Sequence, residues 1–171
     1  ELAAMCHAGA NLVPINATEE ACVCFAERAV RTRAAPATVV GPRHAVESMC
    51  AVLGREWDHP REFRWAQPHL VLSDDPEIEP DPLVRRTTPD QIDLLYPACV
   101  AMYTEEVGVS PMASDGGALY RARVRELIES RRAYARIEDG EVIFKAEIGA
   151  ASGPVCQVQG VWVNPAYRGR G

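Results

Sequence analysis

The chain has 171 residues, of which 47% are hydrophobic and 25% are charged, a balance typical of globular domains. This length suits one domain or two small ones, and it excludes both a disordered tail and a disulfide-stapled miniprotein. No segment reads as the roughly 20 consecutive apolar residues of a membrane-spanning helix, and no signal peptide opens the chain. We therefore expect a cytoplasmic protein with no membrane partner.

The net charge of −6 is unevenly distributed along the chain. Residues 1–82 hold 7 basic and 13 acidic side chains, whereas residues 83–171 hold 11 of each. Phosphate binding needs a basic face, so the acidic first half disfavours nucleic acid as a partner. Lys145 is the only lysine among 18 basic residues. This preference for arginine, together with abundant alanine, is typical of a GC-rich genome of the actinobacterial kind.

The six cysteines lie mostly in apolar, periodic segments without a C-x-x-C spacing, which favours free buried thiols over disulfides. Cys22 and Cys24, with Cys6 and His7 upstream, are the only combination that resembles metal ligands. Zinc spacing requires a second ligand pair, which the sequence lacks there. We therefore expect no metal.

The first 72 residues predict a small α/β domain. Thr18 is the expected cap of one helix, and Gly41-Pro42 precedes another. Apolar residues at helical spacing form the two stripes: Cys22, Phe25, Ala26 and Ala29, then Val46, Met49, Cys50, Leu53 and Trp57. Three short apolar runs, at residues 2–6, 37–40 and 69–73, predict strands and give a β-α-β-α-β order.

Residues 73–82, with five acids and three prolines, predict an exposed linker. After it, residues 83–86 predict a strand, and Thr88-Pro89-Asp90-Gln91 is a capping box that starts a helix. That helix should end near Glu105, Glu106 and Gly108. A second helix follows Gly116-Gly117, and three antiparallel strands are expected at residues 133–138, 142–150 and 156–163.

The last segment, V-Q-G-V-W-V-N-P-A-Y-R-G-R-G, predicts a strand followed by a glycine-rich turn that carries two arginines. Glycine permits close backbone approach and positive φ, so successive N–H groups of such a turn can bind one anion. A diphosphate fits this turn, and an extended amide-containing arm could pair with the preceding strand. Coenzyme A has both parts.

The motif V-N-P-A-Y-R-G-R-G resembles the GNAT superfamily of acyl-CoA-dependent N-acetyltransferases, whose central strand ends in V-x-P before R-x-x-G-x-G or A. The segments YTEEVG and IFKAE also resemble actinobacterial GNAT proteins that have an N-terminal domain of unknown function. The resemblance implies a mixed-sheet α+β fold over residues 83–171 that is truncated at its central motif. It also implies that residues 1–72 form a degenerate GNAT-like layer. Because the sequence stops within the motif, we expect an internal fragment that is inactive alone, with an unpaired strand edge that favours aggregation or a homodimer.

The resemblance also implies the site. The backbone N–H of Val161 would bind the acyl oxygen, Val161, Trp162 and Val163 would line the pantetheine arm, and a set of four residues would bind the diphosphate: Arg168, Gly169, Arg170 and Gly171. Some relatives have a glutamate base four residues before the oxyanion donor, where this chain has Gln157. We expect Glu147 to act as the base instead, with Glu105 and Glu106 binding a cationic substrate.

The expected function is transfer of an acetyl group from acetyl-CoA to an amine of a small molecule or peptide, by direct attack. Two alternatives stay open. One is a non-catalytic acyl-CoA sensor, and the other is a two-domain acetyltransferase resembling mycothiol synthase. The short glycine motif itself is compatible with an ordinary surface turn, and an acid on a strand is often merely exposed.

Overall fold

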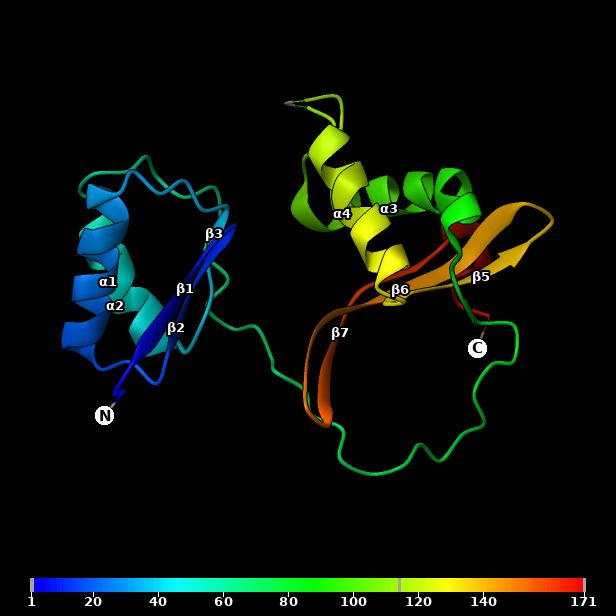
Figure 1. The fold of residues 1–171 in the computed structure, drawn as a ribbon, viewed down its shortest axis with the longest axis horizontal. Coiled ribbons are helices and arrows are strands. Elements are labelled where there is room, and N and C mark those ends of the chain that lie inside the picture. The colour runs from blue at the N-terminus through cyan, green and yellow to red at the C-terminus, as the bar shows by residue number, and fades with distance from the viewer. Residues whose placement is uncertain (1, 114, 171) are drawn as a thin grey trace. The chain divides into compact units, whose positions relative to one another are not determined.

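The computed structural model describes residues 2–113 and 115–170, and the chain divides into two compact units, Glu1–Ser73 and Asp74–Gly171. Each unit combines helices with its own sheet, so the fold is mixed α/β with two sheets and, over the described residues, four α-helices (Figure 1). No helix in these described ranges combines the length and apolar character that crossing a membrane requires.

Unit 1 is a three-stranded sheet with two helices on one side (Figure 1). Strand β1 pairs antiparallel with β2, and β2 pairs parallel with β3 after the crossover helix α1. The elements are β1 (Met5–Ala8), β2 (Asn11–Ile15), α1 (Glu19–Arg31), β3 (Thr38–Val39) and α2 (Arg43–Leu53). The two helices and β2 enclose the core of this unit.

The predicted cap and apolar stripes explain the helices of unit 1. The hydroxyl of Thr18 accepts a hydrogen bond from Ala21 N at 3.3 Å, which satisfies one free N–H of the first turn of α1. Cys22 and Ala26 on α1 and Met49 on α2 are fully buried beside Leu12 of β2. Helix α1 therefore forms where the 3.6-residue period placed it, whereas α2 ends at Leu53, before Trp57, the last residue of its predicted stripe.

The strand order predicted for unit 1 was wrong. It is β-β-α-β-α, because residues 11–15 form a strand that the sequence analysis missed and residues 69–73 form none. Leu70, Val71 and Leu72 are 85%, 76% and 97% exposed, and no strand pairs with them among the described residues. A strand needs a hydrogen-bonded neighbour, which an apolar run alone does not supply.

Unit 2 is an antiparallel sheet of order β4-β5-β6-β7, with α3 and α4 over one face (Figure 1). The elements are β4 (Arg85–Arg86), a 3-10 turn (Pro89–Gln91), α3 (Ile92–Val107), α4 (Ala118–Glu129), β5 (Ala133–Glu138), β6 (Glu141–Ser152), β7 (Val155–Val163) and a second 3-10 turn (Pro165–Tyr167). The capping box at Thr88 and Gln91 is present, and Gly108 ends α3 in the left-handed conformation.

The core of unit 2 lies between these helices and the sheet. Leu95 and Cys99 of α3 pack with Val124 and Leu127 of α4 against Ala133 and other residues of β5 and β6. The strands that the sequence predicted at residues 133–138, 142–150 and 156–163 are present, and the last two are longer by one to two residues at some ends. At the turn between β5 and β6, Asp139 and Gly140 both have positive φ, as a two-residue hairpin turn requires.

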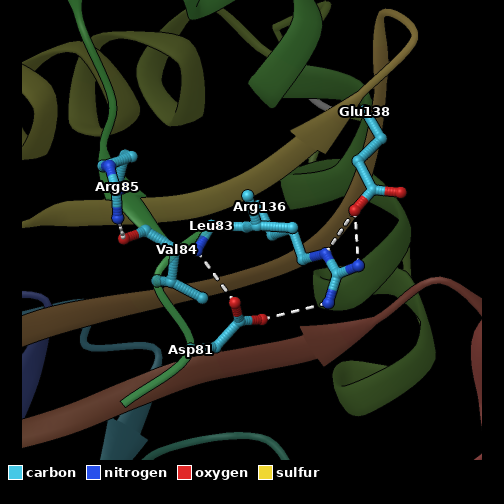
Figure 2. Close-up of polar contacts among 6 residues, drawn as sticks. All are labelled: Asp81, Leu83, Val84, Arg85, Arg136 and Glu138. Carbon is cyan, nitrogen blue, oxygen red and sulfur yellow. Dashed lines mark hydrogen bonds and ion pairs between the residues drawn. The ribbon is translucent and has the colours of Figure 1, made fainter.

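The predicted linker, residues 73–82, is exposed and without helix or strand, but its last part is fixed to unit 2. Asp81 forms an ion pair with Arg136 of β5 at 3.0 Å, and its other oxygen accepts from Leu83 N at 2.8 Å. Figure 2 shows the Arg136 guanidinium between the carboxylates of Asp81 and Glu138. These contacts hold the approach to β4 against β5.

Candidate functional site

A groove in unit 2 collects six of the predicted site residues. It has a volume of about 410 Å³ and lies between the C-terminal end of α3 and the end of β7. Its lining residues are Met102, Glu105, Glu106, Val161, Trp162, Val163 and Arg168. Residues more than 50 positions apart in the sequence therefore meet in one concave surface.

Two of the residues that line the groove, Glu105 and Arg168, form an ion pair. The guanidinium of Arg168 donates from Nη1 to Oε1 of Glu105 at 2.7 Å and from Nη2 to Oε2 at 2.8 Å. This two-pronged geometry lowers the pKa of Glu105 and raises that of Arg168, because each charge stabilises the other. Trp162 also donates from Nε1 to Glu105 at 3.3 Å. The predicted cation-binding carboxylate and the predicted diphosphate-binding guanidinium thus bind each other.

The turn that follows β7 is fixed by side-chain hydrogen bonds. Asn164 accepts from Ala166 N at 3.0 Å and donates to Glu141 at the start of β6 at 2.7 Å. Arg168 also donates from Nε to the carbonyl of Val163 at 2.9 Å. Glu141 was missed by the sequence analysis because it lies 23 residues from Asn164 and outside the motif to which Asn164 belongs.

The other residues of the predicted diphosphate loop lie on the exposed side of this turn. Gly169 has a φ of +71°, the left-handed conformation that the glycine motif predicted. Arg170 donates to the carbonyl of Ala166 at 2.8 Å, and its guanidinium lies 5.1 Å from the ring centroid of Tyr167. Gly171 lies outside the described residues.

Under the same end of the sheet is a buried ion pair. Nζ of Lys145 on β6 donates to Oε1 of Glu147 at 2.6 Å, and the two side chains are 0% and 7% exposed. The same oxygen accepts from the thiol of Cys99 at 3.8 Å. Burial raises the pKa of that thiol to about 12, so Cys99 stays protonated at neutral pH.

Lys145 makes a second hydrogen bond, to the backbone of β7. Its Nζ donates to the carbonyl of Gly160 at 2.9 Å. At this point the register of β6 and β7 shifts, because Lys145 pairs with Trp162 while Glu147 pairs with Gln159. Gly160 and Val161 therefore oppose one residue of β6, as in a β-bulge. Gly160 has a φ of +57°, and a Cβ there would lie 3.0 Å from Glu147 Oε2 and 3.1 Å from Lys145 Nζ.

The predicted site residues thus fall into two groups. The groove holds Val161, Trp162, Val163, Arg168, Glu105 and Glu106, whereas Glu147 lies in the core under β7 and accepts from Lys145. Gln157 is exposed on β7. The role of Glu147 as the base stays a prediction. Its partner Lys145 was missed, although the sequence offered a signal: the chain's only lysine stands two residues from an acid in an apolar strand.

Cys22 and Cys24 do not form the metal site that was considered. Cys22 is buried in the core of unit 1 and Cys24 is exposed. Within the ranges that the structure describes, no three His, Cys, Asp or Glu side chains gather as metal ligands would.

Together these features define a two-unit mixed α/β protein whose groove lies in the second unit. Among protein families, the one described as a domain of unknown function (DUF4081) matches residues 1–95. This match covers more than half of the chain, which therefore belongs to that family. No curated protein and no solved structure matches the chain.

Proposed function

We propose that the chain takes part in acyl-CoA-dependent N-acetyl transfer of the GNAT type, with unit 2 binding acetyl-CoA and an amine as the acceptor. The observation that carries the proposal is the groove, in which the end of β7 and the arginine of the glycine-rich turn face the end of α3. The family match ends at residue 95, so it does not include the residues of β7 that line this groove.

The groove offers the donors and surfaces that an acyl-CoA needs. Val161 is 58% exposed and can present its backbone N–H and an apolar side chain to the acyl-pantetheine arm. Trp162 adds a flat apolar wall, and Arg168 adds positive charge near a left-handed glycine turn. A diphosphate would bind Arg168 by displacing the Glu105 carboxylate from the guanidinium. The same guanidinium edge can donate two hydrogen bonds to either a carboxylate or a phosphate.

Each step of the proposed transfer is assigned to one of these residues or to Glu147. The nitrogen of a neutral amine forms a bond to the thioester carbon, and the carbonyl oxygen gains negative charge that the Val161 N–H stabilises. The C–S bond then breaks, the leaving thiolate takes a proton from water, and the amine nitrogen loses its extra proton to the base. Glu147 is the proposed acceptor of the amine's proton, and Glu105 and Glu106 lie where a cationic acceptor would approach.

The proposal is tested by calorimetry of coenzyme A with the full-length protein. Replacing Arg168 and Arg170 together by Ala removes two charge-assisted contacts of about 1.5–3 kcal/mol each, so the dissociation constant should rise at least about tenfold. The matched control replaces Arg123 and Arg125 of α4, which removes the same charge outside the groove and should leave binding unchanged. Equal affinity of the Arg168 and Arg170 variant and the wild-type protein would contradict the diphosphate assignment.

One observation favours a second function, a non-catalytic acyl-CoA sensor. The carboxylate proposed as the base is buried and already bonded to Lys145, and protonating it would leave a buried ammonium without its counter-ion. The two functions differ in one assay. An acetyltransferase releases free coenzyme A thiol steadily when an amine library is added with acetyl-CoA, whereas a sensor binds the cofactor and releases none.

A further inference from the structure

The only lysine of the chain is fully buried beneath the bulge of β7. Its Nζ joins three elements of the site: Glu147 on its own strand, Cys99 on α3 through the shared carboxylate oxygen, and the carbonyl of Gly160 on β7. Burying an ammonium is costly, and an apolar pair of similar volume is often as stable or more stable. This position therefore calls for a role beyond packing.

The carbonyl that Lys145 contacts belongs to the same peptide group as the Val161 N–H. This peptide is trans and planar, since no cis bond occurs among the described residues, so its C=O and N–H point in opposite directions. The carbonyl points to the buried ammonium and the N–H points away from it. A hydrogen bond from a charged donor to the carbonyl oxygen draws electron density from the nitrogen and strengthens the N–H as a donor.

We propose that Lys145 is a positioning residue that fixes the Gly160–Val161 peptide and polarises it, so that the Val161 N–H binds the acyl oxygen more strongly as charge develops there. In this arrangement Glu147 is the counter-ion of the Lys145 ammonium. This inference rests on the proposed function, because it assigns a task to the N–H that contacts the thioester. Glycine at residue 160 also suits this arrangement, because an added Cβ would lie 3.1 Å from Lys145 Nζ and 3.0 Å from Glu147 Oε2.

The first test needs no ligand. Full-length protein labelled with [15Nζ]lysine and [1-13C]glycine should show, by NMR, a scalar coupling across the hydrogen bond between Lys145 Nζ and the carbonyl carbon of Gly160. Adding [15N]valine identifies the amides that follow a glycine carbonyl, and in this chain these are Val109 and Val161. In the charge-free variant K145M/E147M, the Val161 amide proton should move upfield while that of Val109 stays in place.

The second test measures the proposed role. K145M/E147M also removes the proposed base, so its kcat falls for either reason. The readout that is specific to Lys145 is the strength of the hydrogen bond from the Val161 N–H to the acyl oxygen. The C=O stretching band of bound [1-13C]acetyl-CoA should lie at a higher frequency in K145M/E147M than in the wild-type protein. The reason is that a weaker hydrogen bond to the thioester oxygen lowers this frequency less. The matched control is L127A, which weakens the same core from α4 without touching the Gly160 carbonyl, and its band should remain at the wild-type position.

The outcomes separate the two proposals. If the wild-type protein binds no acetyl-CoA, the proposed function fails and the inference fails with it. If the wild-type protein binds and transfers normally, but K145M/E147M keeps the wild-type thioester band, the inference alone is overturned. A shifted thioester band in K145M/E147M that is absent from L127A supports both. Should L127A shift the band equally, Lys145 has only a structural role.

Discussion

The two units of the chain build their cores differently. In unit 1 every buried residue among those described is apolar, from Leu12 of β2 to Met49 of α2. In unit 2 the buried set also contains Thr87, Lys145 and Glu147. A purely apolar core stabilises a fold at no cost in buried charge, whereas an ion pair in a core must overcome desolvation of both partners. Among the described residues, the core of unit 2 therefore bears a desolvation cost that the core of unit 1 does not.

The family match divides the chain in a different place from the structure. It begins in unit 1, crosses the exposed segment and ends at Leu95, inside α3. The groove uses the C-terminal end of that same helix together with β7. A change at the end of α3 is therefore expected to act on the groove, whereas a change in α1 or α2 is expected to act on the core of unit 1 alone.

The largest effect should come from removing Lys145 alone. In Lys145→Met the Glu147 carboxylate stays buried without its partner, so unit 2 should lose about 3–5 kcal/mol of stability. The measurement is hydrogen exchange of β6 and β7 amides, with unit 1 amides as the internal control. K145M/E147M should recover most of the loss. Equal loss in the single and double variants would show that packing, and not the unpaired charge, is responsible.

A core truncation in unit 1 gives the opposite pattern. Met49 of α2 is 0% exposed in the core of unit 1, so Met49→Ala should leave a cavity and cost about 2–5 kcal/mol. The loss should appear in the exchange of α1 and α2 amides and leave coenzyme A affinity unchanged. A change in that affinity would mean that the first unit contributes to ligand binding.

A smaller effect is expected from Gly160→Ala. A non-glycine residue at a φ of +57° costs about 1–2 kcal/mol, and the contacts at 3.0 and 3.1 Å with Glu147 and Lys145 add to this. Gly140→Ala is the matched control, because Gly140 also has a positive φ but has open space around its Cβ position. Denaturant unfolding should show a larger loss of unfolding free energy for Gly160→Ala than for Gly140→Ala. Equal losses would contradict the expectation that contacts of the new Cβ with Glu147 and Lys145 are destabilising.

The smallest effect concerns the pH response of the ion pair at the groove. Arg168 lowers the pKa of Glu105 below its ordinary 4.5. A carboxyl with a lowered pKa keeps its stabilising contact above its unfolded pKa and loses it as pH falls through the folded pKa. Trp162 fluorescence should therefore change at a midpoint below pH 4.5 and remain constant between pH 5 and 8. Glu105→Gln should abolish this transition, and a midpoint near neutral pH would contradict the assignment.

Several features of the chain follow from local sequence. The period of 3.6 residues, the cap at Thr18 and the capping box at Thr88 placed all four helices, because each signal depends on residues within one or two turns. The turns at Asp139-Gly140 and after Ser152 fixed the hairpins of unit 2 for the same reason. The residues at the end of β7 and at the end of α3 that were predicted as site residues share one groove, but that juxtaposition comes from the fold and not from the motif.

Other features depend on contacts between distant residues, which no local signal carries. Residues 69–73 have the composition of a strand but no partner, and residues 11–15 became a strand because β1 and β3 flank them. The pairing of Arg168 with Glu105 spans 63 residues, and the bond from Lys145 to the Gly160 carbonyl depends on the shift in register between β6 and β7. The sequence determined which side chains could do chemistry. Only tertiary packing decided which of them are buried, which are already paired, and which backbone group the single lysine contacts.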